Sequence, residues 1–407
     1  MKRLTPGTYN VARRGLPREI NRQIVVNLVR ARQPVSRADL ARLMATRRGA
    51  VSLLVNDLIA EGLLFEGATG EAPRGRKPKF LYIDSRRRCV LAVDIRPTRT
   101  SLMVTDLLGE PVVSISGFPT EMDPRRFVKQ LAARLQRTLA EHAASARCEG
   151  IGVVVPGMVD PEGAKVLFAP RLGWRDVPLR DMLSALTKLP VHIENSGRAC
   201  ALAQLWASRT DTGSFGDFAY VSVSDGLGIG IVVRGELLRG RHNVAGEFGH
   251  TPLNVDGPPC ACGAAGCWEA YVSNLATLSR YFGREISPRK PIPAEISQFT
   301  VEDLIARARG GDGKAVAALQ ATAHYLGLGL ASLVNAVDPA RIYLGGEIIG
   351  AWDMIEATLR QAIAARALRP AATDIEIITV PSQDNPRLRG AAALIAAPLF
   401  SATAAAG

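Results

Sequence analysis

A cluster of metal-binding residue types constrains this chain more than any other feature of its sequence. His250, Cys260, Cys262 and Cys267 lie close together in a chain of 407 residues that has only six Cys and five His. Three thiolates and one neutral imidazole form a Cys₃His set, a common closed tetrahedral shell for zinc. The alternative, three unrelated buried cysteines, is disfavoured by the spacing and by the two intervening glycines, which permit a tight turn. We predict one Zn²⁺ per chain with a largely structural role.

The positive charge of the chain is concentrated at its N-terminal end. Residues 1–88 contain 19 Lys and Arg against 7 Asp and Glu, whereas residues 89–407 contain 31 of each. A basic segment joined to a neutral body is typical of a polyanion-binding module fused to a sensor or an enzyme. The alternative is a solvated basic face without a partner, which is weakened by the helical pattern of the same region.

Length and composition limit the class of protein. A chain of 407 residues predicts two to four units, and 47% hydrophobic residues are sufficient for full cores. No run of eighteen apolar residues occurs, and the N-terminus lacks the apolar segment of a secretory signal. The other three cysteines are scattered singly, which is typical of a reducing compartment. We therefore expect a cytoplasmic protein without a membrane span.

The basic N-terminal region has the pattern of a winged helix-turn-helix, which we place at residues 1–85. Apolar spacing predicts helices over 18–32, 36–44 and 47–61, with Ser36 as the N-cap of the second helix and Thr46 as that of the third. Alternating residues at 63–65 and 79–83 predict two strands. In this arrangement the third helix enters the DNA major groove.

Two groups of side chains in this region are candidates for DNA contact. The polar face of the third helix presents Arg47, Arg48, Ser52 and Asn56, types suited to base edges and phosphates. The loop between the strands contains Arg74, Arg76 and Lys77, which suit a narrow minor groove. Two alternatives stay open: the helices form a protein-binding winged-helix module, or the loop is a flexible linker.

The rest of the chain alternates between strands and helices, which predicts an α/β body. The expected strands lie at 89–95, 101–109, 111–118, 150–155, 191–194, 218–224, 228–234, 341–344 and 375–379, with a helix over 124–144.

Several strings in the body resemble the ROK family (repressors, open reading frames and kinases), and specifically its xylose- and N-acetylglucosamine-type transcriptional regulators. They are Val-Pro-Gly-Met-Val-Asp-Pro-Glu-Gly at 155–163, Leu-Gly-Trp-Arg-Asp-Val-Pro-Leu at 172–179, Ile-Glu-Asn at 193–195, Ala-Gly-Glu-Phe-Gly-His at 245–250, the cysteine cluster, and Tyr-Leu-Gly-Gly-Glu at 343–347. The resemblance covers nearly the whole chain. It implies a two-lobed sugar kinase fold of the ribonuclease H/actin type, with lobe 1 at 88–205 plus 385–400 and lobe 2 at 206–384.

Two departures from the resembling kinases predict a domain without catalytic activity. Those kinases have an Asp-x-Gly-Gly-Thr phosphate turn, whereas this chain has Arg96-Pro97 in place of both glycines. Proline lacks a donor N–H, and both residues add bulk where phosphate must approach the backbone. The family's catalytic base is the Asp of Glu-Asn-Asp, and the corresponding residue here is Ser196, whose hydroxyl is no base near neutral pH.

The resemblance also implies a sugar-binding site. The kinases' sugar contacts correspond here to Asn195, Glu247, His250 and Glu269. Arg171 stands where many relatives have Asn. Two interpretations are open: a cation that admits a phosphorylated or acidic sugar, or one that closes the pocket with an ion pair. His250 can serve the metal with one ring nitrogen and the ligand with the other.

These observations predict a sugar-responsive DNA-binding regulator, more specifically a repressor, with a catalytically degenerate kinase domain as sensor. Its expected partners are a double-stranded DNA operator, a sugar or sugar-phosphate effector and a second copy of itself, as a homodimer or homotetramer. Two alternatives are an active sugar kinase with an accessory DNA-binding domain and a regulator controlled by a protein partner.

Overall fold

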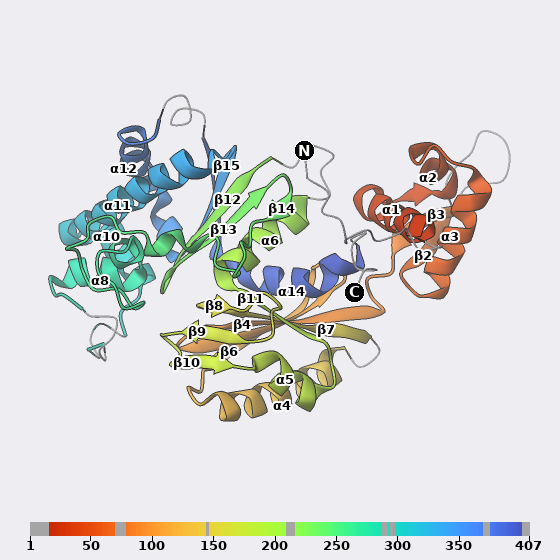
Figure 1. Cartoon of the computed structure of the whole chain (residues 1–407), viewed down its shortest axis with the longest axis horizontal. Coiled ribbons are helices and arrows are strands. Elements are labelled where there is room, and N and C mark those ends of the chain that lie inside the picture. Colours follow the sequence, from red (N-terminus) through yellow and green to blue (C-terminus); the bar gives the residue numbers. More distant parts are fainter. Residues whose placement is uncertain are drawn as a thin grey trace, which may run out of the picture.

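Residues 16–69 and 79–83 of the computed structural model form a helical unit closed by a small sheet (Figure 1). The structure describes residues 16–69, 79–143, 146–208, 216–286, 292–293, 296, 298–368 and 375–400. The elements of this N-terminal unit are α1 (Leu16–Arg32), β1 (Val35–Ser36), α2 (Arg37–Leu43), α3 (Arg48–Ala60), β2 (Leu64–Thr69) and β3 (Lys79–Ile83). The predicted winged helix-turn-helix is present, and β1 adds to the predicted pair a third strand, in the order β1-β3-β2.

The ends of α2 and α3 differ in how far they match the sequence-based expectation. Ser36 caps α2 as predicted, in a capping box with Asp39: the Ser36 hydroxyl accepts from the Asp39 amide at 3.2 Å. The N-cap of α3 is Arg47 without a side-chain cap, so the prediction that Thr46 caps this helix was wrong. The preceding turn bends instead through Ala45 with φ 47°.

The body contains two sheets of five strands each. The first has the order β11-β7-β4-β5-β6, with β11, β7 and β4 parallel and with β5 and β6 antiparallel to their neighbours. Its strands are β4 (Arg88–Ile95), β5 (Arg99–Asp106), β6 (Pro111–Pro119), β7 (Arg147–Val155) and β11 (Val191–Asn195). A smaller sheet of β8 (Met158–Val159), β9 (Val166–Ala169) and β10 (Trp174–Val177) lies beside it. Helices α4 (Pro124–His142) and α5 (Leu179–Thr187) pack on the outer side of the first five-stranded sheet (Figure 1).

The second sheet has the order β14-β13-β12-β15-β16. Its strands are β12 (Phe218–Val223), β13 (Leu227–Val233), β14 (Glu236–Leu237), β15 (Arg341–Gly346) and β16 (Glu376–Val380). One face packs against a helical layer of α7 (Glu269–Val272), α8 (Asn274–Phe282), α10 (Val301–Arg309), α11 (Gly313–Val337) and α12 (Trp352–Ala364). Helix α11 is long and apolar enough to cross a membrane by length and composition alone, but more than half of its apolar window is buried within this layer.

Two helices lie between the sheets and connect them. Helix α6 (Ser196–Ser208) packs on β12 and β13 of the second sheet, and α14 (Pro386–Leu399) packs on β4 and β7 of the first. The two helices also pack on each other, so the order through the body is sheet, helix, helix, sheet (Figure 1). The predicted α/β class and the two-lobed sugar kinase type of fold are therefore confirmed. Short 3-10 turns η1 (Glu247–His250), η2 (Glu347–Ala351) and η3 (Ser382–Asp384) complete the described elements.

Candidate functional site

The predicted metal ligands converge in space. The ligand atoms of His250, Cys260, Cys262 and Cys267 all lie within 4.8 Å of one another. The His250 Nδ1 and Cys260 Sγ are 3.6 Å apart, and the sulfurs of Cys262 and Cys267 are 3.8 Å apart. A tetrahedral zinc ion with bonds of about 2.3 Å to sulfur separates its ligands by about 3.8 Å. The four residues therefore fit the size and donor set of a tetrahedral zinc site.

The backbone of the cluster is shaped by two short bridges and a glycine. Pro252 pairs with Cys267 and Pro259 with Ala265, so the segment folds back on itself. Gly266 has φ 70°, and a Cβ there would lie 1.6 Å from the Asn254 carbonyl oxygen, so any side chain would displace the neighbouring backbone.

The two buried sulfurs of the cluster, those of Cys260 and Cys267, suit a cation. Burial raises the pKa of the Cys260 thiol, because a thiolate is costly where water is excluded. Burial likewise raises the pKa of Cys267. A bound divalent ion would supply the compensating charge and hold both sulfurs as thiolates.

One pocket gathers every predicted sugar-binding residue. Asn195, Glu247, His250 and Glu269 all line it, although they come from three separate parts of the chain, namely the end of β11, the turn η1 and the start of α7. Ser196 and Pro97 line the same pocket, so two of the three residues that depart from the kinase pattern face it. The walls come from both sheets and from the metal-binding segment, through Cys262.

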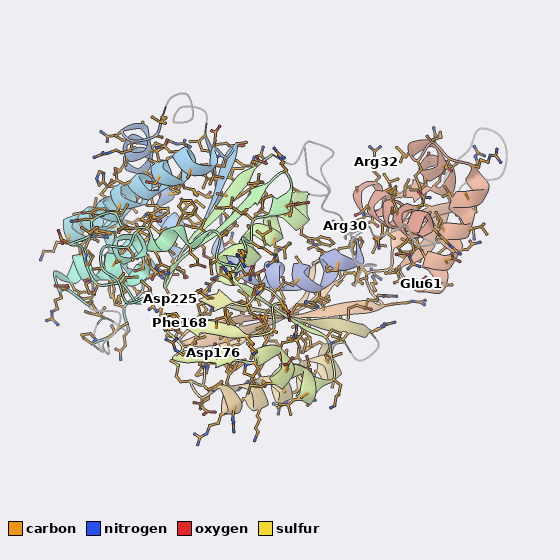
Figure 2. All side chains as sticks on the ribbon, in the orientation of Figure 1. Arg30, Arg32, Glu61, Phe168, Asp176 and Asp225 are labelled. Carbon is orange, nitrogen blue, oxygen red and sulfur yellow. The ribbon has the colours of Figure 1, made fainter. Side chains whose placement is uncertain are left out.

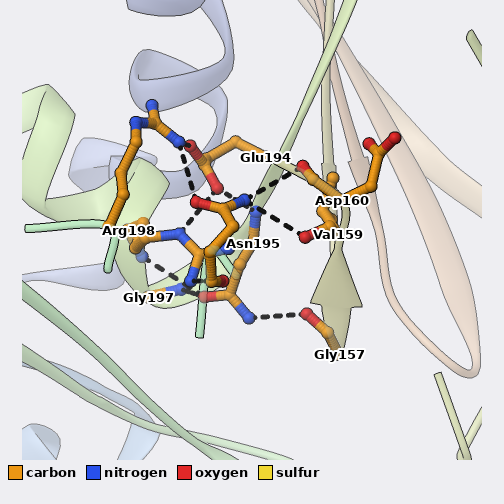
Figure 3. A network of polar contacts seen from close by, with 9 residues as sticks. Gly157, Val159, Asp160, Glu194, Asn195, Gly197 and Arg198 are labelled. Atoms are coloured by element: carbon orange, nitrogen blue, oxygen red, sulfur yellow. Dashed lines mark hydrogen bonds and ion pairs between the residues drawn. The ribbon is translucent and has the colours of Figure 1, made fainter. Parts of the chain in front are cut away.

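Asn195 is fixed by hydrogen bonds at the junction of β11 and α6. Its Nδ2 donates to the Gly157 carbonyl at 2.8 Å, and its Oδ1 accepts from the Gly197 amide at 2.8 Å (Figure 3). The side chain thus caps the start of α6 while it holds the loop after β7. A hydroxyl of a ligand would compete for these same groups.

His250 connects the metal cluster with the pocket. Its Nδ1 lies toward Cys260, whereas its Nε2 lies 3.9 Å from a carboxylate oxygen of Glu247. Burial raises the pKa of Glu247, although His250 and Arg198 act in the opposite direction. The predicted division of the two ring nitrogens is compatible with this geometry.

Glu269 ties the metal-binding segment to the glycine-rich turn after β12. Its Oε2 accepts from the Leu227 amide at 2.9 Å, and its Oε1 lies 3.7 Å from Cys260 Sγ. A Cβ at Gly226 would come within 2.7 Å of the same carboxylate, so the turn approaches Glu269 as closely as glycine permits.

Two arginines bridge the sheets beside the pocket. Arg171, from the loop between β9 and β10, donates to the Asp225 carbonyl in the turn between β12 and β13. Arg96 forms ion pairs with Asp94 at 3.1 Å and with Glu347 at 3.0 Å. Arg171 lines the pocket, and its contact with Asp225 is a hydrogen bond to a main-chain carbonyl. The second partner of Arg96, Glu347, lies too far along the chain to be found from sequence.

The third helix of the N-terminal unit places its polar residues outward. Arg47, Arg48 and Asn56 are exposed and Ser52 is half-buried. Asn56 is not free, since its Oδ1 accepts from Arg37 Nη1 at 2.8 Å, and Arg37 also pairs with Glu66 at 2.9 Å. Sequence reasoning missed Arg37, which precedes this helix in the chain. The loop residues Arg74, Arg76 and Lys77 lie outside the described residues.

The same helix has an apolar residue at the centre of its outer face. Leu53 is 66% exposed, and one turn earlier Gly49 leaves open space on that face. Leu53 was not among the predicted contacts, because only polar side chains of this helix were considered as candidates for DNA contact.

Comparison with known proteins decides the family. Residues 90–397 match the ROK family. The chain belongs to the ROK family. Its sequence is 27% identical to the xylose repressor of Caldicellulosiruptor bescii, over 95% of this chain and 98% of that one. Its fold is similar to the crystal structure of a ROK family transcriptional regulator described as a homolog of the E. coli MLC protein, with a TM-score of 0.79, 27% identity and coverage of 95% and 98%.

A ROK enzyme is similar to the body alone. The glucokinase of Streptomyces griseus, solved with glucose and AMPPNP, has a TM-score of 0.63 and 28% identity. It covers 75% of this chain and 99% of its own, whereas the regulator covers nearly all of both. The N-terminal unit is therefore a feature that this ROK chain shares with the regulator.

Proposed function

We propose that this ROK protein is a sugar-responsive transcriptional repressor whose kinase-type body is a sensor without catalytic activity. The observation that carries the proposal is the ion pair of Arg96 with Glu347, because Arg96 stands where the resembling kinases have a glycine of their phosphate turn and its side chain reaches the other sheet. Ser196 at the position of the kinase base and the basic N-terminal unit support the same function. The similar xylose repressor and ROK regulator are consistent with it.

In this proposal each part of the chain has a defined role. Residues 1–85 bind a double-stranded operator through Arg47, Arg48 and Ser52, with Asn56 held by Arg37 and with Arg74, Arg76 and Lys77 as further candidates. Lobe 1 (88–205 plus 385–400) and lobe 2 (206–384) bind a sugar between them through Asn195, Glu247, His250 and Glu269. Zn²⁺ held by His250, Cys260, Cys262 and Cys267 would brace the loop that carries two of these side chains.

The assembly follows from the mode of DNA recognition. Winged helix-turn-helix proteins bind palindromic operators as dimers whose recognition helices lie about 34 Å apart. We therefore expect a cytoplasmic homodimer or homotetramer.

A DNA-binding measurement tests this function. The full-length protein should prefer DNA from upstream of its own gene over scrambled DNA at physiological salt, and calorimetry should detect binding of d-xylose or d-glucose. Equal affinity for the two DNA molecules would refute the repressor. If Glu247→Ala leaves the heat of sugar binding unchanged, the assigned pocket is refuted.

A second candidate is an active sugar kinase with an accessory DNA-binding domain. It is favoured by the retained Asn195, Glu247 and Glu269 and by the similarity to a glucokinase. A coupled ATP assay over a panel of hexoses and pentoses decides: turnover that Glu247→Ala abolishes would establish the kinase. A third candidate is a regulator controlled by a protein partner. Release of the protein from DNA by a partner protein, without any sugar, would indicate it.

A further inference from the structure

Helix α6 runs from the sugar pocket to the N-terminal unit. Its first residue, Ser196, lines the pocket directly after Asn195, and its last turn contains Trp206. At 1.5 Å per residue, its thirteen residues span about 20 Å. One rigid element therefore has a proposed ligand contact at one end and, at the other, a contact with the helical unit.

Arg30 of α1 makes that second contact. Its guanidinium lies 3.4 Å from the ring centroid of Trp206, and its Nη2 donates to the Trp206 carbonyl oxygen at 2.7 Å. Arg30 is 7% exposed and Trp206 is 6% exposed, so the contact is desolvated, where stacking of a cation on an aromatic ring is strongest. Figure 2 shows Arg30 at the boundary between the N-terminal unit and the body.

The surroundings of this contact join the two parts into one core. Asn27 Nδ2 donates to the Phe400 carbonyl at 2.6 Å, and the rings of Phe400 and Trp206 lie 5.2 Å apart. Buried residues of α1, α3, α6 and α14 belong to one hydrophobic cluster. The N-terminal unit is thus docked on the body at the end of α6.

Close backbone packing makes α6 move as a unit. A Cβ at Gly197 would lie 2.4 Å from the Ile229 amide nitrogen of β13. A Cβ at Gly390 of α14 would lie 2.0 Å from the Ala199 carbonyl oxygen. Contacts this tight leave little room for α6 to bend, because packed interiors transmit displacements and do not absorb them.

The first turn of α6 is held by a buried polar network that joins it to β11 and to the end of β8 (Figure 3). Arg198 pairs with Glu194 at 2.8 Å and donates to the Asn243 carbonyl at 2.8 Å. The Asn243 amide in turn donates to the carbonyls of Val159 and Asp160 at 3.1 Å. Any change of Asn195 or of the pocket walls therefore acts on the start of α6.

We propose that α6 couples the pocket to the DNA-binding unit, with Arg30 as the positioning residue that links the helix to α1. This inference rests on the proposed function and specifies its regulation. A ligand that takes over the hydrogen bonds of Asn195 displaces α6, and the stack of Trp206 on Arg30 passes the displacement to α1. The recognition helix packs on α1, so its position relative to a second copy changes.

A double-mutant cycle on the full-length protein tests the coupling without a known ligand. Asn195→Ala should change the Kd for DNA from upstream of the gene by about fivefold or more, the lower end of allosteric coupling. In the Arg30→Ala background the same substitution should change Kd by less than about twofold, since the link is cut. Arg32→Ala is the matched control, because Arg32 is exposed on the same helix and no contact is seen for it in the described part of the chain. It should preserve the full effect of Asn195→Ala.

Equal effects of Asn195→Ala in the wild-type and Arg30→Ala backgrounds would overturn the proposal, as would no effect in either. Hydrogen exchange gives a readout that needs no variant in the N-terminal unit. Asn195→Ala should accelerate exchange of the amides of residues 16–32, and unchanged protection there would also overturn the proposal.

The experiment separates this inference from the proposed function. If calorimetry detects no heat of sugar binding, or if the protein does not prefer the upstream DNA, the proposed repressor function is refuted. The alternative outcome is that sugar changes the affinity for DNA by the same factor in wild type and in Arg30→Ala. The protein would then still be a sugar-responsive repressor, and only the role of α6 would be refuted.

Discussion

Arg96 and Glu347 lie 3.0 Å apart, although one follows β4 of the first sheet and the other follows β15 of the second. Arg96 also pairs with Asp94, and Glu347 also accepts hydrogen bonds from Ser224 and Asn274, each at 3.2 Å. The Arg96 side chain therefore bridges the two sheets beside the pocket. Three predictions about catalysis and stability follow from this ion pair.

Restoring the missing base alone should not restore catalysis. Ser196→Asp supplies a carboxylate, which typically contributes about 10²–10⁴-fold. In the proposed function, however, Arg96 and Pro97 still stand in place of the glycines that the resembling kinases have in their phosphate turn. We expect no ATP-dependent sugar phosphorylation from Ser196→Asp, and detectable turnover only when Arg96→Gly and Pro97→Gly are added. A coupled assay measures both. Turnover by Ser196→Asp alone would show that the turn does not block phosphate.

Breaking the bridge should destabilise the body. Arg96→Ala leaves Asp94 and Glu347 without their main cation, and removal of one partner of a buried pair costs about 3–5 kcal/mol when fully desolvated. Because the Arg96 side chain is 31% exposed, we expect a smaller loss, about 1–3 kcal/mol, in urea unfolding. Arg360→Ala is the control, since Arg360 pairs with Glu356 on an exposed surface and should change stability by less than about 1 kcal/mol.

The same bridge should make stability fall in acid. Burial alone would raise the pKa of Glu347, but Arg96 and the hydrogen bonds outweigh it, so its pKa lies below the usual value. A depressed folded-state pKa adds stability above the unfolded pKa of about 4.3, and this stability is lost as the pH falls through the folded value. Wild type should therefore lose stability below about pH 4.3 more steeply than Glu347→Gln. Parallel unfolding curves against pH would contradict this.

Local features of the sequence predicted much of this molecule, and distant contacts account for what was missed. The metal cluster was found because its four ligands are close in the chain, and the long strands of the body were found because each is an apolar run. The short strands β8, β9, β10 and β14 were not predicted. Arg96 with Glu347, and Arg30 with Trp206, are joined only by the tertiary fold. Leu53 was not singled out, because an apolar residue type alone does not indicate a solvent-exposed side chain.

The metal cluster should bind one zinc ion per chain and stabilise lobe 2. Cys267→Ser removes one ligand, and we expect loss of bound zinc by elemental analysis together with a lower Tm, by about 2–4 °C for each kcal/mol lost. Cys148→Ser is the control, because Cys148 lies outside the cluster, on β7. Equal zinc content in the two variants would refute the assignment of the four ligands.

The exposed face of α3 should contribute specificity through Leu53. An apolar side chain on a recognition helix contacts the C5 methyl group of thymine, and the absence of a side chain at Gly49 permits close approach to the bases. We expect that uracil in place of one operator thymine lowers the affinity of the wild type by several-fold, and that Leu53→Ala removes this sensitivity. Arg48→Ala provides the comparison: it should cost about 1–3 kcal/mol if it reads a guanine, while sensitivity to uracil is retained. If Leu53→Ala still distinguishes thymine from uracil at every position, Leu53 does not read a thymine methyl group. Its exposed apolar side chain would then be assigned to a contact with a protein.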